Sequence, residues 1–285
     1  MTNMNQEDKI LIEKTSGEME AFSRDKLRRS LERAKASPAI IDKIVDHVLK
    51  ELKNGDKTSD IYKHTFRILS DNERPSAGRY HLKHALMELG PSGHPFEKFV
   101  GELLRAQGFT VEVGTMVEGS CVTHEVDVTA QKDNHHIMVE CKFHNQPGVK
   151  SDVKIALYVQ ARFEDVAKKW QQEPSHGQKF HEVWLVTNTK LTTDAISYAT
   201  CVGMTAIGWH YPEDNSLEHL IEQFNLHPLT CLTALNNSQK QQLINQGFVL
   251  CKKLAEDPSV LKSAGFNKDE VEQIIQEIKE LCHLP

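Results

Sequence analysis

Two short segments in the middle of the chain alternate apolar and charged side chains with a period of two. The first is His-Glu-Val-Asp-Val at 124–128, and the second is Ile-Met-Val-Glu-Cys-Lys-Phe at 137–143. Neighbouring side chains of a β-strand point to opposite faces, so the valines fill one face of each strand and the charged residues the other. If the two strands form a hairpin, Asp127, Glu140 and Lys142 converge.

Two neighbouring carboxylates and an amine are typical of metal-assisted phosphodiester hydrolysis. The carboxylates repel each other unless a cation lies between them, and hard oxygen ligands suit Mg²⁺ or Mn²⁺. Such an ion polarises a phosphate oxygen and acidifies a bound water, while a lysine offsets developing negative charge. The pattern alone also fits a solvent-exposed strand face, which is the more frequent arrangement.

The length and the order of the predicted elements indicate more than one domain. With 285 residues, 39% of them hydrophobic, the chain has room for two or three domains. The Gly-Pro-Ser-Gly cluster at 90–93 disfavours helix and strand and therefore marks a boundary between two domains. We expect domains at 8–91, 92–215 and 229–285. Strands and helices alternate in the second, which predicts an α/β fold with a mixed sheet flanked by helices.

Apolar periodicity places the elements of the middle domain. It begins with an amphipathic helix whose apolar stripe ends before Gly108. Strands and further helices follow in alternation. The stripe of the first helix is Phe96, Phe99, Val100, Leu103 and Leu104; the strands are expected at 110–113, 122–130, 136–143, 182–187 and 204–209, and the further helices at 153–170 and 192–202.

Charge and cysteine usage exclude several classes of protein. The net charge of −6 does not favour nucleic-acid binding, although it bears on solubility and steering rather than on fold. The six cysteines are scattered without a CxxC pair, which argues against a zinc ribbon and a disulfide framework. Neither an apolar run of about 18 residues nor an apolar signal core is present, so no membrane span and a cytoplasmic location are expected.

The middle domain resembles the PD-(D/E)xK restriction-endonuclease superfamily, and especially its Mrr-like branch. The resemblance covers about 93–212 and rests on the order and spacing of several pieces. These are the Gly-x-x-Phe-Glu-x-Phe-Val start of the first helix at 93–100, the Glu-Val-Asp-Val and Val-Glu-Cys-Lys strands, the Trp-Leu-Val-Thr-Asn strand at 184–188, and the Ile-Gly-Trp end at 207–209. The resemblance implies a restriction-endonuclease-like fold and DNA as substrate.

The same resemblance assigns roles to individual residues. It makes Asp127 and Glu140 the metal ligands and Lys142 the catalytic lysine. Glu97 matches a helix position that often completes the acidic site, and Gln160 matches a glutamine often placed beside the catalytic lysine. An ordinary solvated helix surface is an almost equally good interpretation of Glu97 and Gln160.

The N-terminal segment resembles the start of an ATP-cone, a nucleotide-sensing module. It opens with Ile-Glu-Lys-Thr-Ser-Gly-Glu-Met-Glu-Ala-Phe-Ser-Arg-Asp-Lys-Leu at 12–27, which predicts a short strand pair and then helices. Ser23 is expected to cap the first helix and Pro38 to end or kink it. The resemblance implies ATP or dATP as effector, with Lys14 and Lys26 on the phosphates; Thr15 stands where many members have a basic residue. The alternative is a small helical domain with ordinary surface lysines.

The C-terminal segment is expected to be helical and contains a weak internal repeat. Leu-Ile-Asn-Gln-Gly-Phe at 243–248 is similar to Leu-Lys-Ser-Ala-Gly-Phe at 261–266. The repeat resembles helix-hairpin-helix elements, whose glycine turns bind DNA phosphates. A helix that ends at a glycine cap with an apolar anchor explains the pattern equally well.

Three hypotheses of function follow. The leading one is a Mg²⁺-dependent DNA endonuclease of the type IV restriction class, regulated by ATP or dATP, and acting as a homo-oligomer. The second is a catalytically inactive nucleotide-sensing DNA-binding or scaffold protein. The third is a Holliday-junction-type repair nuclease, which shares the chemistry and differs in substrate.

Overall fold

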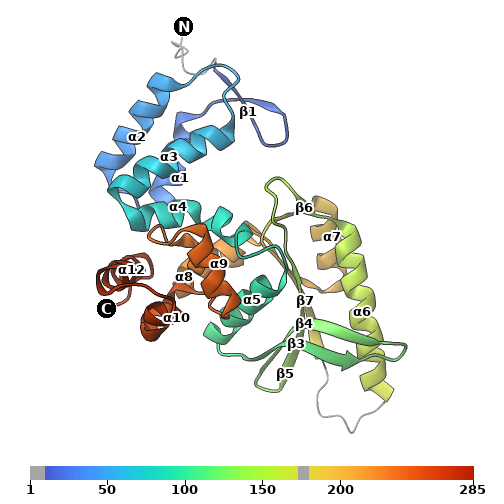
Figure 1. Ribbon diagram of the computed structural model, residues 1–285. Coiled ribbons are helices and arrows are strands. Elements are labelled where there is room, and N and C mark those ends of the chain that lie inside the picture. The colour runs from blue at the N-terminus through green and yellow to red at the C-terminus, as the bar shows by residue number, and fades with distance from the viewer. Residues whose placement is uncertain (1–9, 173–179) are drawn as a thin grey trace. The chain divides into compact units, whose positions relative to one another are not determined.

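The computed structural model describes residues 10–172 and 180–285, and its elements are labelled in Figure 1. The polar N-terminus and the first two residues of the first predicted domain lie outside this description. The chain divides into two compact units. The first comprises Met1–Ala85, Cys231–Lys240 and Cys251–Pro285, and the second comprises Leu86–Thr230 and Gln241–Leu250. The three-domain division made from the sequence stays a prediction.

The second unit is built on a five-stranded mixed sheet with the order β3-β4-β5-β7-β9. Strands β3, β4 and β5 pair antiparallel, whereas β5, β7 and β9 pair parallel. The predicted α/β fold with a mixed sheet is therefore confirmed. The strands are β3 (Thr110–Glu118), β4 (Thr123–Lys132), β5 (His135–Lys142), β7 (Phe180–Thr187) and β9 (Thr205–Ile207), and β6 (Lys150–Ser151) pairs with β8 (Lys190–Leu191) separately.

Helix α5 (His94–Ala106) covers one face of this sheet. The five residues of its predicted apolar stripe are all buried, as the period of 3.6 requires. Gly101 lets the helix approach β3 closely, because a methyl group there would lie 3.1 Å from Val113 Cγ2. Close packing of α5 on β3 and β4 holds the first turn of the helix, and with it Glu97, over the sheet.

Helices α6 (Val153–Gln172) and α7 (Thr193–Val202) lie on the other side of the sheet from α5 (Figure 1). A cluster of buried apolar residues joins these two helices to β7 and β9. Its members are Ala156, Val159, Val183, Leu185, Leu191, Ala195, Ala199, Met204 and Ala206. The unit closes with helix α8 (Leu217–Phe224).

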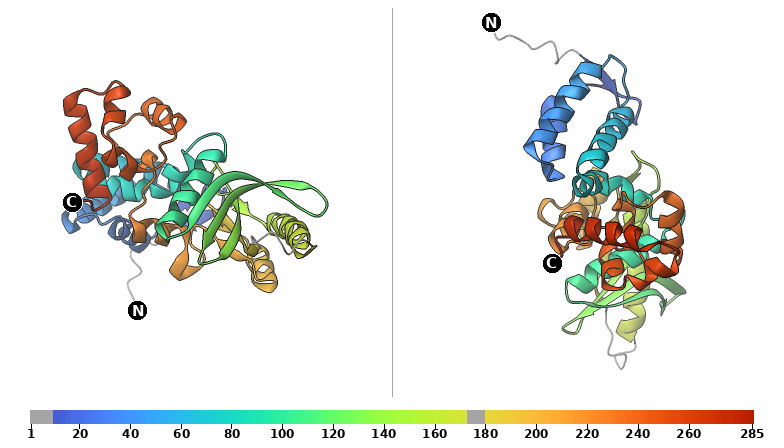
Figure 2. Two further views of the ribbon diagram at one scale, coloured as in Figure 1. Left: turned by 90° about the horizontal axis from the view of Figure 1, so that it is seen from below. Right: turned by 60° about the vertical axis from the view of Figure 1, so that its left-hand side comes forward.

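Strands β3 and β4 form a long curved ribbon, which Figure 2 shows from below. Strand β3 runs through Gly114, which has a φ of +70° in the region that glycine adopts most easily, and continues to Glu118. The sequence pattern predicted only 110–113 because a glycine inside a run suggests an end or a bulge.

The first unit begins with the predicted strand pair, β1 (Leu11–Glu13) and β2 (Met19–Ala21). Ser23 caps α1 (Arg24–Arg33) by accepting a hydrogen bond from Lys26 N, as predicted. The prediction for Pro38 is wrong. Helix α1 ends before it, and Pro38 is the first residue of α2 (Pro38–Glu51), where the missing N–H costs nothing. Helices α3 (Thr58–Asn72) and α4 (Arg74–Met87) follow.

The C-terminal segment is helical, as predicted, and its two glycine turns share one geometry. Gly247 and Gly265 both have φ of +95°, and the N–H of each following phenylalanine donates to a leucine carbonyl five residues back at 3.1 Å. This is the Schellman pattern of a helix end, which supports the glycine-cap interpretation of the repeat. The helices are α9 (Asn237–Asn245), α10 (Cys251–Glu256), α11 (Ser259–Ser263) and α12 (Lys268–Leu281).

No helix in residues 10–172 or 180–285 combines the length and the apolar composition that a bilayer crossing requires.

Candidate active site

Asp127 lies where the ladder between β4 and β5 ends. The last paired residues are Val128 and Val139, and the next backbone group on β5, the N–H of Cys141, donates to Asp127 Oδ2 at 2.7 Å. The carboxylate of Asp127 thus bridges to β5 beside Glu140. Val128 and Val139 themselves are fully buried, so this end of the strand pair is anchored in the core.

Glu140 is paired with an arginine that the sequence analysis did not single out. Arg162 on α6 donates through Nη1 to Glu140 Oε2 and through Nη2 to the carbonyl of Glu125. The side chains of Arg162 and Glu140 are only 10% and 17% exposed. A signal was present, because Arg162 continues the buried stripe of α6 after Val159 at a spacing of three. A charged residue in such a stripe needs a buried partner.

Burial and mutual repulsion raise the pKa values of the two acids. Burial raises the pKa of Asp127 to about 6, and the charge of Glu97 adds to the rise. Burial raises the pKa of Glu140 to about 7, and the charge of Asp127 adds to it, whereas Arg162 and Lys142 favour the ionised form. Glu97, Asp127, Glu140 and Lys142 are therefore close enough to interact electrostatically. Such perturbed groups cluster at functional sites.

Lys142 and Glu97 complete the group from two different elements. Lys142 is the last residue of β5, where it pairs with Thr187 of β7, and within the described part of the chain its ammonium makes no hydrogen bond or ion pair. Its charge lowers the pKa of His144 further, after burial has lowered it. Glu97 lies in the first turn of α5, 20% exposed, with Oε2 3.1 Å from His94 Nδ1.

Gln160 lies on α6 but makes no hydrogen bond to Lys142. Its Nε2 donates to Glu164 Oε1 at 3.0 Å, one turn along the same helix. Its Oε1 is buried and has no hydrogen-bond partner among the described residues. The structure thus brings Asp127, Glu140, Lys142 and Glu97 together, and it does not pair Gln160 with Lys142.

The histidines that flank the two strands belong to structural networks. His124 Nε2 lies 2.9 Å from Asp165 Oδ2, and Asp165 also accepts hydrogen bonds from the backbone of the β3–β4 turn. His144 Nε2 lies 3.1 Å from Ser151 Oγ, and its main chain pairs with the side chain of Asn188. Both rings therefore fix loops beside the acids.

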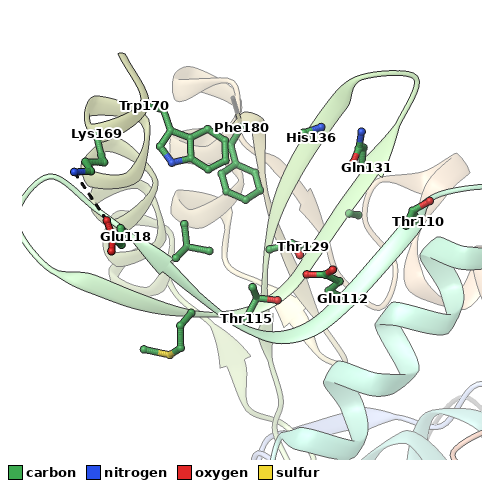
Figure 3. Close-up of a pocket in the computed structure, with 13 residues that line it drawn as sticks. Thr110, Glu112, Thr115, Glu118, Thr129, Gln131, His136, Lys169, Trp170 and Phe180 are labelled. Atoms are coloured by element: carbon green, nitrogen blue, oxygen red, sulfur yellow. Dashed lines mark ion pairs between the residues drawn. The ribbon is translucent and has the colours of Figure 1, made fainter. Parts of the chain in front are cut away.

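A hollow of about 610 Å³ lies elsewhere in the same unit, between β3, β4 and the end of α6 (Figure 3). The rings of Trp170 and Phe180 stack at 4.3 Å on its wall, and Lys169 lies 3.9 Å from Glu118. None of the predicted catalytic residues lines it. A site that cuts a polymer such as DNA does not need to enclose its substrate, so the group around Asp127 remains the better candidate.

In the first unit, the two lysines that were predicted to bind nucleotide both form ion pairs with one glutamate, Glu20. Lys14 Nζ lies 2.5 Å from Glu20 Oε2, and Lys26 Nζ contacts Glu20 Oε1. Glu18 also lies 3.2 Å from Lys14. Hydrogen bonds from the two lysines lower the pKa of Glu20 to about 2. The two ammonium groups are thus close together and already neutralised.

The raised pKa values predict an unusual pH dependence of stability in metal-free protein. The folded state holds protons on Asp127 and Glu140 that the unfolded state releases near pH 4, so this contribution is full below about pH 4 and is lost as the pH rises through 6 and 7. We expect the site to contribute on the order of 1–3 kcal/mol less at pH 8 than at pH 5.

Urea unfolding in the presence of a chelator, at several pH values, measures this contribution. The control is Asp127→Asn, which cannot ionise. The expected result is a steeper fall in unfolding free energy for the wild type than for the variant between about pH 4 and pH 6, where Asp127 is ionised in the unfolded state and still protonated in the folded state. Parallel curves for the two proteins would contradict the raised pKa of Asp127.

Two families of known proteins match parts of this chain. Residues 90–207 match the family described as restriction endonuclease, the Mrr-type catalytic domain. Residues 227–282 match the family described as AF1548-like, C-terminal. The mixed sheet and this match define the middle of the chain as a restriction-endonuclease-like domain, a class that suggests nuclease activity.

The relatives define the family of the chain. An uncharacterised protein of Archaeoglobus fulgidus is 36% identical over 183 residues, which cover 64% of this chain and 99% of the relative. The crystal structure of AF1548, described as a protein of unknown function, is similar with a TM-score of 0.55 and 34% identity, over 67% of this chain and 99% of that one. The chain belongs to the AF1548-like family.

Proposed function

We propose that the chain is a Mg²⁺-dependent DNA endonuclease, related to type IV restriction enzymes, that hydrolyses phosphodiester bonds at Asp127, Glu140 and Lys142. One observation carries the proposal. Two partly buried acids with raised pKa values lie at the end of paired strands, beside a lysine, inside a restriction-endonuclease-like domain. Buried carboxylates without sufficient counter-charge are costly, which favours a cation there.

The residues fit a hard divalent ion. The donors are carboxylate oxygens, which Mg²⁺ and Mn²⁺ prefer, and a single cation, Arg162, is bonded to Glu140. Asp127 and Glu140 would hold the ion, and Glu97 would supplement them. When bound, the ion would polarise a phosphate oxygen and lower the pKa of a water.

The remaining steps fall to side chains of the protein. The ammonium of Lys142 is not engaged elsewhere in the described structure, so it is available to orient a water and to stabilise the negative charge of the transition state. Gln160 could position that ammonium with its buried, unpartnered Oε1 after a change of rotamer.

Incubation of purified full-length protein with DNA tests the function. Plasmid, linear, methylated and four-way-junction DNA are each incubated with and without Mg²⁺ and with and without ATP. Cutting that requires Mg²⁺ is the expected result. Preference for the four-way junction would select the Holliday-junction hypothesis instead, and no cutting of any DNA would favour an inactive binding or scaffold protein.

We further propose that the N-terminal segment is an ATP-cone whose occupancy by ATP or dATP controls cleavage or assembly into homo-oligomers. A strand pair followed by helices, with Lys14 and Lys26 close together, supports this. A nucleotide phosphate would replace the carboxylate of Glu20 between the two ammonium groups, since both offer anionic oxygens.

Replacement of Glu20 should strengthen nucleotide binding. Glu20→Gln should bind ATP and dATP severalfold more tightly than the wild type, because the two ammonium groups lose the carboxylate that they share and Lys14 keeps only Glu18. Lys26→Ala should bind more weakly. Calorimetric titration measures this, with Lys63→Ala as control because Lys63 is exposed and lies 3.7 Å from Asp60 on α3, rather than in the turn between β1 and β2 that carries Lys14. Absence of binding at millimolar nucleotide in all four proteins would leave the segment without a sensor role.

A further inference from the structure

Three side chains with metal-binding atoms meet on the surface of α2 and α3, in the first unit. His47 Nε2 lies 3.5 Å from Glu51 Oε1, and His64 Nε2 lies 3.5 Å from Glu51 Oε2. One ligand atom of each residue lies within 4.8 Å of the other two, and among residues 10–172 and 180–285 this is the one such set of three. This set does not include Asp127, Glu140 or Glu97 of the candidate active site.

The positions along the chain explain why these three groups meet. His47 and Glu51 are four residues apart on α2, so they lie on the same face of that helix one turn apart. His64 approaches from α3, which packs beside α2 (Figure 1). The two imidazole rings stack with centroids 4.7 Å apart.

The distances are close to those of a coordinated ion. Ligand atoms about 2.0–2.1 Å from a tetrahedral Zn²⁺ lie roughly 3.3 Å from each other. The two separations of 3.5 Å exceed this by a few tenths of an ångström, and they reach the two different oxygens of Glu51. With one atom taken from each residue, the three atoms lie within 4.8 Å of one another, so the side chains must draw closer together to share one ion.

The ring of His64 supports a ligand at this cluster. Its Nε2 is buried, and the structure gives it no hydrogen bond within the described residues. Buried polar atoms are normally satisfied, and a water or an ion can satisfy one that has no protein partner. The atom faces Glu51, as a ligand to an ion shared with that carboxylate would.

We propose that His47, Glu51 and His64 bind a divalent transition-metal ion of the Zn²⁺ class. Two imidazole nitrogens and one carboxylate oxygen suit such ions, whereas Mg²⁺ and Ca²⁺ prefer oxygen ligands throughout. Three protein ligands leave a further position for water. Because the ion joins α2 to α3, its binding stabilises the first unit.

Arg67 competes with a metal ion for the ring of His64. Its Nη2 lies 3.0 Å from His64 Nδ1. A guanidinium can only donate, so this contact requires a lone pair on Nδ1 and places the ring proton on Nε2. Coordination at Nε2 needs the opposite tautomer. Arg67 is exposed and can swing away, and its removal should strengthen metal binding.

Zinc titration of the full-length chain tests the proposal. The protein carries no histidine tag and has Asp127→Asn, which weakens the nuclease site as a competing binder. Zn²⁺ affinity is measured by calorimetry, and Co²⁺ absorption reports imidazole coordination. We expect one site whose affinity falls at least tenfold in His47→Ala and in His64→Ala and rises in Arg67→Ala.

Two further variants keep the test decisive. Glu51→Gln is nearly isosteric and should also weaken binding, so it serves if a histidine variant fails to fold. His210→Ala is the matched control and should leave the affinity unchanged. His210 pairs with Glu218 at 2.9 Å, and no third ligand group joins them within residues 10–172 and 180–285. Equal affinity in the His47, His64 and His210 variants, or no Zn²⁺ binding at all, would overturn the proposal.

Discussion

Asp127→Asn and Lys142→Ala should each reduce Mg²⁺-dependent DNA cleavage by about 10³-fold or more, because the first loses an anionic metal ligand and the second loses the ammonium that stabilises the reacting phosphate. The asparagine exchange is the cleaner of the two. Its amide oxygen can still accept the hydrogen bond from Cys141 N, which the carboxylate accepts at 2.7 Å, so the end of β4 stays attached to β5. The variant should therefore fold and still lack a metal ligand.

Initial rates of plasmid cleavage at saturating Mg²⁺ measure the effect, with circular dichroism to confirm folding. Glu118→Gln is the matched control, because Glu118 is a carboxylate on β3 that is 78% exposed, and it should cut at the wild-type rate. Metal-dependent cutting by both Asp127→Asn and Lys142→Ala at wild-type rates would show that the site lies elsewhere.

Arg162→Met should destabilise the protein, and more strongly at alkaline pH. The exchange leaves the buried carboxylate of Glu140 and the carbonyl of Glu125 without their guanidinium partner. Breaking a buried ion pair typically costs about 3–5 kcal/mol, but Glu140 can escape part of this by taking up a proton, since its pKa is already raised to about 7. We expect a loss of about 2–3 kcal/mol near pH 8.5 and a smaller one near pH 5.5.

The pH dependence of this stability loss follows from the ionisation of Glu140. Arg162 stabilises ionised Glu140, so its contribution is present where Glu140 is charged and fades as the pH falls through the pKa of that group. In the variant the pKa of Glu140 rises further, and the acid limb of the cleavage profile should move to higher pH. Urea unfolding at both pH values and a pH–rate profile measure the two effects.

Arg162→Lys separates charge from geometry in this prediction. The lysine keeps a cation beside Glu140, but one ammonium cannot reproduce the two-pronged contact of the guanidinium with Glu140 and Glu125. Compared with Arg162→Met, Arg162→Lys should restore most of the wild-type dependence of stability on pH. It should restore only part of the unfolding free energy. A loss of stability that is equal at both pH values for Arg162→Met would indicate that packing, and not the ion pair, is the role of this arginine.

Local pattern was enough to predict much of the middle domain. The period-two alternation around Asp127 and Glu140 predicted two adjacent strands, and the structure pairs them. The stripe from Phe96 to Leu104 predicted α5, and its five residues are buried. These predictions work because strand alternation and helix periodicity are properties of consecutive residues. Gly114 shows their limit, since a glycine in a strand was taken for its end while β3 continues through it.

The sequence by itself thus determined most of the strands and helices of the middle domain and which acids and lysine the strands carry. Only the tertiary structure decided that Arg162, 22 residues from Glu140 along the chain, pairs with that acid, that Glu20 pairs with both lysines of the predicted nucleotide site, and that His64 joins His47 and Glu51. The physical reason is that such partners are chosen by the packing of distant elements, and a one-dimensional pattern contains no distances between residues that are far apart in the chain.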